Sequence, residues 1–260
     1  MATAVRPIMD GVGDIEEVEP VTVTQDLWLL PGDLELSRFE DRLSDAWPRG
    51  FTGNDQAALR VTTAFHRIIQ RAAERVDAEI VLIDVGPNLG AINRAALLAA
   101  DAVLMPLAAD LFSLRGLRNL GPTLREWRST WRGTVLPKVP PTISAPQGTM
   151  SPLGYVIMQP TMRLDRPVRA YQRWLDRIPI VFATAVLDQE DFTIGQRYEI
   201  ATLRNYQSLM PLAHDARKPM FDLRSADGAL GSTQMLVQRC YQDFKALSEE
   251  LLRRLSAGVG

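Results

Sequence analysis

The chain has 260 residues, of which 46% are hydrophobic and 23% are charged, with a formal net charge of −2. This length fits one large α/β domain with ample core, and the near-neutral charge gives no overall basic signal for nucleic acid. A single cysteine, Cys240, excludes an intramolecular disulfide framework and a cysteine-ligated iron–sulfur site. Without a long apolar run or a basic N-terminal leader, we expect neither a membrane partner nor a signal peptide.

The first 50 residues predict three short segments. Residues 1–20 are acidic and contain two prolines, which favours an irregular N-terminus. Residues 21–30 alternate well enough for a strand, ended by a Pro-Gly pair. Residues 34–47 predict a short helix that a proline ends.

A longer helix and a buried strand follow. Residues 56–76 carry apolar side chains at helical spacing, and Asn54 or Asp55 is the candidate N-cap. Residues 80–83 form an unbroken apolar run, which fits a parallel strand covered by helices on both faces. Helix and strand in alternation predict the α/β class.

Asp84 ends this apolar run. Ligands of open α/β sheets bind beyond the carboxyl ends of the strands. A carboxylate there can hold Mg²⁺, directly or through water, beside nucleotide phosphates. Gly86, Pro87 and Gly90 predict a tight loop before a helix that begins near Ala91. The alternative interpretation is an Asp that only stabilises a turn.

The middle of the chain continues the alternation. Residues 102–107 predict a strand, and Asp110 and Ser113 are candidate caps of a helix that ends near residue 131. Residues 133–152 are rich in proline and predict a surface loop within one domain. A strand of the same sheet is expected at residues 153–158.

In this order the segments resemble the ParA-type partition ATPases, relatives of the MinD-like deviant P-loop NTPases. The stretch DVGPNLGAINRAALLAADAVLMPLAADLFSLRGL, from Asp84 to Leu117, carries most of the likeness, and residues 27–40 and 153–159 add to it. The resemblance implies one domain over residues 1–260, with a three-layer, mostly parallel sheet and helices on both faces.

The resemblance also implies roles for individual residues. Asp84 matches the Walker B aspartate, which would hold Mg²⁺ through water, and the loop after it matches the switch that senses the γ-phosphate. The switch residues are Gly86, Pro87 and Asn88. The nucleotide contacts implied are Asp110 and Ser113 at the rim and the Gln159 amide at the adenine edge.

The family's phosphate-binding loop is missing from the chain. Such a loop needs a glycine-rich turn followed by Gly-Lys-Ser/Thr. The chain has three lysines, Lys138, Lys218 and Lys245, and none follows a glycine. Carboxylates flank residues 11–13, the nearest glycine cluster, and would repel a triphosphate, so a plain turn is expected there. The first strand of the family fold is missing too.

Three explanations follow from this difference. We favour an N-terminally truncated product of a partition ATPase; the others are a degenerate relative that acts by binding and a partner chain that supplies the missing part. ATP and Mg²⁺ are the cofactors that the resemblance implies. The alternative is that this chain, without the phosphate-binding loop, binds no cofactor. Its status as an ATPase therefore stays open at this point.

Two sets of arginines are candidate DNA contacts. Arg163, Arg166, Arg169 and Arg173 lie in the segment 163–177, which predicts a helix with Asp165 as its candidate cap, and the last three share a face. The helix over residues 110–131 carries a second set, with Trp127 and Trp131 either exposed for nucleic acid or buried. A solvated arginine face is the alternative for both.

The C-terminal helix is expected at residues 233–256, with an apolar stripe that packs on the core rather than binding a membrane. The resemblance implies a bacterial cytoplasmic protein, associated with the nucleoid when bound to DNA. It would form ATP-dependent homodimers, bind DNA nonspecifically and meet a ParB-like partner during partitioning of a plasmid, chromosome or other cargo. The alternative is a non-catalytic interaction or DNA-binding protein.

Overall fold

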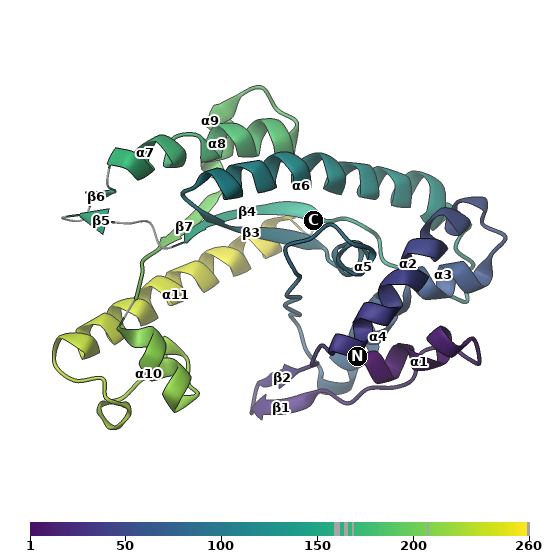
Figure 1. The fold of residues 1–260 in the computed structure, drawn as a ribbon, viewed down its shortest axis with the longest axis horizontal. Helices are drawn as coiled ribbons and strands as arrows, with labels where there is room; N and C mark the ends of the chain where they lie inside the picture. Colours follow the sequence, from purple (N-terminus) through teal and green to yellow (C-terminus); the bar gives the residue numbers. More distant parts are fainter. Residues whose placement is uncertain (159–161, 164–165, 168, 207, 259–260) are drawn as a thin grey trace. The chain divides into compact units, whose positions relative to one another are not determined.

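The computed structural model describes residues 1–158, 162–163, 166–167, 169–206 and 208–258 (Figure 1). The chain divides into two compact units. The first unit comprises Met1–Asp101 and Thr123–Ser151, and the second comprises Ala102–Pro122 and Pro152–Gly260. That residues 1–260 act as a single domain stays a prediction.

Helices build the core of the first unit. The helices are α1 (Ala2–Asp10), α2 (Ser37–Arg49), α3 (Gln56–Thr62), α4 (Ala64–Val76) and α5 (Ala91–Ala99). Side chains from four of them meet in one apolar cluster that includes Val5, Phe39, Phe65 and Ala95. The expected helix at residues 56–76 is present, with a break at Thr63. Asp55 caps it by accepting a hydrogen bond from the Ala58 N–H at 2.9 Å.

Helix α1 corrects the prediction of an irregular segment at residues 1–20. Its apolar side chains Val5 and Ile8 are buried, and this burial outweighs the cost of Pro7 inside the helix. Gly11 ends α1 with φ of 71°, a conformation that glycine adopts without strain. The turn predicted for residues 11–13 is therefore confirmed.

The segment at residues 21–30 folds back on itself. Instead of one strand, β1 (Val21–Thr24) and β2 (Leu27–Leu29) pair antiparallel. The turn between them contains Gln25 and Asp26. The alternation of apolar side chains was a true strand signal, but the turn inside it was missed.

Residues 80–83 do not form the predicted strand. Among the described residues no strand pairs with this segment. Its side chains Ile80, Val81 and Leu82 are exposed, Leu82 by 90%, and only Ile83 packs against the apolar cluster. An apolar run becomes a strand only where neighbouring backbone supplies its hydrogen bonds. That neighbour is a property of the tertiary structure, which the local sequence pattern does not report.

The second unit contains a three-stranded sheet. Its strands are β3 (Ala102–Ala108), β4 (Ser151–Met158) and β7 (Glu199–Leu203), in the order β3-β4-β7, with β4 and β7 parallel. The predictions of β3 and β4 are confirmed, whereas β7 was missed.

Helices lie on both sides of this sheet (Figure 1). They are α6 (Leu111–Thr130), α8 (Ile178–Val181) and α9 (Phe192–Arg197) on one side and α11 (Ser232–Gly258) on the other. The predicted α/β class, with helices on both faces of a parallel sheet, is confirmed. Residues 178–187 are helical throughout. α10 (Leu209–Ala216) lies in the same unit.

Arg254 fastens α11 to the sheet. Its guanidinium donates to the carbonyl oxygens of Leu153 at 3.1 Å, Arg197 at 3.0 Å and Glu199 at 3.2 Å. Glu250 Oε1 accepts a hydrogen bond from Nε of the same guanidinium at 2.6 Å.

Within the described part of the chain, no helix combines the length and apolarity needed to cross a bilayer.

A nearly buried arginine ties the segment after α1 to α4. Arg67 is 7% exposed, and its Nη1 lies 2.8 Å from Asp14 Oδ1. Its remaining donors reach the Thr63 hydroxyl and the Arg60 carbonyl oxygen. Burial raises the pKa of Asp14, but hydrogen bonds from Arg67 and the Ile15 N–H outweigh it and hold that pKa below its ordinary value.

We expect Asp14→Asn to lower the free energy of unfolding by about 1–2 kcal/mol at neutral pH, a value reduced for the partial exposure of Asp14. The carboxylate stabilises the folded chain above the pKa of the unfolded state, near 3.8, and this contribution is lost as the pH falls through the lower folded pKa. Urea unfolding should therefore show a difference between the two proteins at pH 7 that shrinks below pH 4. A difference that is constant with pH would contradict this assignment.

Candidate functional site

Asp84 lies in the first unit between the extended segment at residues 80–83 and helix α5. Its side chain is exposed. The helix after it begins at Ala91, as predicted. The carboxylate is therefore accessible to a hydrated cation, although it does not stand at the end of a paired strand.

A buried asparagine holds the predicted switch loop. Asn93 Nδ2 donates to the carbonyl oxygen of Gly86 at 2.8 Å and to that of Asn88 at 2.6 Å. The Gly90 N–H in turn donates to Asn88 Oδ1 at 2.9 Å. The turn at Gly86, Pro87 and Asn88 is thus held in place by the Asn93 amide. The sequence signal that could have identified Asn93 is a single amide side chain in a helix made mostly of apolar residues.

Glu40 caps the N-terminus of α5 from another helix. Its two carboxylate oxygens accept the backbone N–H groups of Ala91 at 2.5 Å and Ile92 at 2.8 Å. A negative charge is favourable at this end of a helix. A Cβ at Gly90 would lie 2.7 Å from Glu40 Oε1 and 2.9 Å from Asn88 Oδ1, so a side chain there would displace these two groups. Gly90 and Ala91 have no side chain that could cap the helix. This absence was the signal in the sequence that a residue elsewhere in the chain supplies the cap.

We expect Glu40→Gln to lower stability by about 1 kcal/mol, because the charged cap is lost while one acceptor oxygen remains. Amide hydrogen exchange at Ala91 and Ile92 should become faster than in the parent chain. Glu35→Gln is the matched control, since Glu35 makes only an exposed ion pair with Arg6 at 3.6 Å. Equal effects of the two changes would contradict the capping role.

Arg94 packs inside the first unit. Its guanidinium lies 4.4 Å from the centre of the Trp47 ring and 5.8 Å from that of Trp127. Burial lowers the pKa of Arg94. Arg94 is therefore a packed residue of the first unit and does not lie on a solvated helix face. Trp127 and Trp131 are buried, as one of the two interpretations expected.

Asp110 and Ser113 lie in the second unit at the start of α6. Asp110 Oδ1 accepts the Ser113 N–H at 2.8 Å, and Ser113 Oγ accepts the Ala108 N–H at 2.9 Å. The capping prediction is confirmed, and both side chains are engaged in it. Their role as nucleotide contacts stays a prediction. Gln159, the predicted adenine contact, lies outside the described residues.

The residues present do not by themselves fit Mg-ATP. The lysines make other contacts: Lys138 with the Phe51 carbonyl oxygen, Lys218 with Asp227 and Lys245 with Glu249. Within the described ranges, no group of three or more His, Cys, Asp or Glu side chains comes together. Asp84 would thus share a cation with water and phosphate oxygens, and the phosphates would lack the lysine that this fold class uses.

The first candidate DNA contacts do not share one helix. Arg163 ends β5 (Met162–Arg163) and Arg166 begins β6 (Arg166–Pro167), and these strands pair antiparallel. The predicted helix over residues 163–177 is therefore wrong at its start. The proline that follows Arg166 disfavours helical backbone at Arg166.

The remaining arginines of this set lie on α7 (Arg169–Leu175). Arg173 is exposed, and its guanidinium lies 4.7 Å from the centre of the Trp174 ring. This stacking leaves the charge available at the surface. DNA binding by Arg163, Arg166, Arg169 and Arg173 stays a prediction.

Two curated relatives match part of the chain. A putative replication protein A of Rhizobium rhizogenes is 28% identical over 156 residues, covering 55% of this chain and 36% of that protein. The chromosome partitioning protein ParA of Caulobacter vibrioides is 27% identical over 129 residues, covering 49% of this chain and 43% of that protein. The chain thus spans about two fifths of the length of these relatives.

A solved structure shares the fold. The crystal structure of protein DIP2308 from Corynebacterium diphtheriae matches 79% of this chain and 70% of that protein, with a TM-score of 0.61 and 22% identity. The model of a family described as an AAA domain matches residues 2–135. Because this match covers more than half of the chain, the chain belongs to that family, the ParA-like partition ATPases.

Proposed function

We propose that the chain is part of a ParA-like ATPase that partitions a plasmid, a chromosome or another cargo, and that the chain is inactive without a phosphate-binding loop. ATP and Mg²⁺ would drive self-association, and the homodimer would bind DNA nonspecifically in the bacterial cytoplasm, at the nucleoid. A ParB-like partner would stimulate hydrolysis. The observation that supports this proposal best is the pinned loop behind Asp84, with Asn93 beneath it and Glu40 at the start of α5.

This loop has the properties that a phosphate sensor needs. Asp84 is exposed beside it, so a hydrated cation has access. The turn at Gly86 and Asn88 is held by two hydrogen bonds from the Asn93 amide, and a shift of the loop would break them. A change at the loop would reach α5 directly, because Gly90 and Ala91 follow it.

The test joins a phosphate-binding loop that contains Gly-Lys-Ser/Thr, with its strand, to the N-terminal side of the chain. It then compares self-association with ATP and Mg²⁺, with ADP and Mg²⁺, and without nucleotide, by light scattering after size exclusion. We expect larger species with ATP and Mg²⁺ alone. Asp84→Asn should abolish them, whereas Asp41→Asn, a charge removal at an exposed site on α2, should not. Self-association that ignores nucleotide would count against the proposal.

The contacts of the lysines favour a second candidate function, a non-catalytic interaction protein. All three lysines make contacts away from the loop at residues 84–91. In that case a fluorescent ATP analogue should not bind even to the chain extended by the phosphate-binding loop, and Asp84→Asn should leave every binding activity unchanged. Nucleotide binding that depends on Asp84 would exclude this second candidate.

A further inference from the structure

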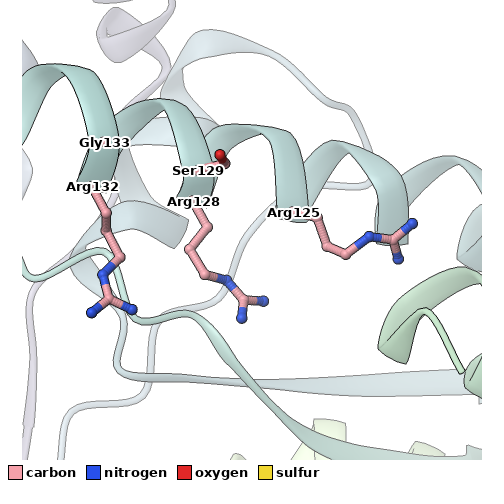
Figure 2. Close-up of a pocket in the computed structure, with 5 residues that line it drawn as sticks. All are labelled: Arg125, Arg128, Ser129, Arg132 and Gly133. Carbon is pink, nitrogen blue, oxygen red and sulfur yellow. The ribbon is translucent and has the colours of Figure 1, made fainter.

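A basic cavity lies along the helix that runs from α6 into the π-helical turn at Trp131–Val135. Figure 2 shows three side chains that project from the same side of this helix, those of Arg125, Arg128 and Arg132. With Ser129 and Gly133 they line a cavity of about 630 Å³. Among the described residues that line it, none is acidic.

Two of these arginines have hydrogen-bonding capacity that the fold does not use. The Arg128 Nε is buried and has no partner among the described residues, and Nη2 reaches the Met150 carbonyl oxygen only at 3.3 Å. Arg132 is exposed, and its guanidinium makes no ion pair or hydrogen bond within the described ranges. Burial lowers the pKa of Arg128, and the charges of Arg132 and Arg125 lower it further. A carboxylate beside this pair would therefore be favourable.

The spacing of the pair matches the spacing of side chains on a second helix. Arg128 and Arg132 are four residues apart, which is about 6 Å along a helix axis. Two carboxylates four residues apart on a partner helix have the same separation, so each can meet one guanidinium. Gly133 leaves open space beside Arg132, because no atom of another segment lies within 4 Å of the place where its Cβ would be. The partner backbone can therefore approach closely.

We propose that Arg128 and Arg132 dock an acidic helix of a partner protein, one that carries glutamate or aspartate at positions four residues apart. Charge complementarity favours an anionic partner. The buried Arg128 Nε favours a carboxylate on a flexible side chain, which can enter the cavity, over phosphates fixed along a polymer backbone. Two contacts are also too few to hold a nucleic acid at physiological salt, where nonspecific binding draws on many phosphate contacts.

The test follows the arginine Nε–H signals in nitrogen-15 NMR spectra of the full chain, without nucleotide, during addition of a peptide. The probe is an alanine-rich helical peptide with two glutamates four residues apart, and the same peptide with glutamines is the control ligand. We expect the Arg128 and Arg132 signals to shift with the glutamate peptide alone. Arg132→Gln should weaken the binding seen at Arg128 about two- to fivefold, the loss of one exposed charge pair.

Two further variants make the test specific. Arg118→Gln is the matched control on α6, because Arg118 is exposed and does not line the cavity, and it should leave the affinity unchanged. Arg132→Glu should bind a peptide with lysine in place of glutamate better than it binds the glutamate peptide. Arg132 is exposed, so both of its variants should fold, which circular dichroism melts check.

Each outcome decides the assignment. Equal shifts with the glutamate and glutamine peptides, or equal affinity of the parent chain and Arg132→Gln, would overturn the docking site. A DNA duplex that binds through Arg132 while the glutamate peptide does not would identify another ligand and overturn the assignment to a protein helix. The docking site needs neither a nucleotide nor the phosphate-binding loop, so its failure and that of the proposed function are distinguishable.

Discussion

Replacing Gly121 by alanine should destabilise the second unit by about 2–4 kcal/mol. Gly121 lies in α6, where alanine is normally the better helix former by about 1 kcal/mol. Here a Cβ would lie 2.2 Å from the carbonyl oxygen and 2.5 Å from the carbonyl carbon of Ala185. Both are backbone atoms, so the clash is relieved only by moving α6 away from residues 182–187.

Gly116 on the same helix is the matched control for this change. No atom lies within 4 Å of the place where its Cβ would be. Gly116→Ala should therefore stabilise the chain by about 0.5–1 kcal/mol, through the lower backbone entropy of the unfolded state. Urea unfolding followed by circular dichroism measures both variants. Two changes of the same sign would refute the close approach of Gly121 to Ala185.

Trp131→Ala should destabilise the first unit by about 3–5 kcal/mol, the range for a large aromatic side chain removed from a core. Trp131 is 0% exposed and stacks on Trp47 at a ring distance of 6.3 Å. Its Nε1–H donates to the Pro146 carbonyl oxygen at 2.8 Å. The Trp131 indole thus helps to hold the loop that follows α6, together with the contact from Arg128 to the Met150 carbonyl oxygen.

Trp131→Phe separates the two contributions of the indole. It keeps a ring beside Trp47 and loses the hydrogen bond to Pro146, so we expect less than half of the loss seen with alanine. Limited proteolysis between residues 139 and 149 should accelerate in both variants, because both free the Pro146 carbonyl oxygen. Unchanged cleavage would mean that other contacts hold this loop.

Local patterns in the sequence determined much of the secondary structure. Two helices could be predicted from the caps Asp55 and Asp110, because a cap satisfies backbone groups within three residues of itself. The helical spacing of residues 56–76 supported the first of them. The strands at residues 102–107 and 153–158 were also predicted from the pattern of their own side chains. The resemblance read from residues 84–117 led to the right family.

Only the tertiary structure decided the environment of these patterns. The apolar run at residues 80–83 fits a buried strand, yet a strand exists only where a neighbour pairs with it. Helix α1 forms despite Pro7, because the burial of Val5 and Ile8 outweighs the cost of a proline inside a helix. Glu40 reaches α5 from about fifty residues upstream, and Arg94 lies between two tryptophans. Such contacts depend on packing between distant segments, which spacing along the chain does not encode.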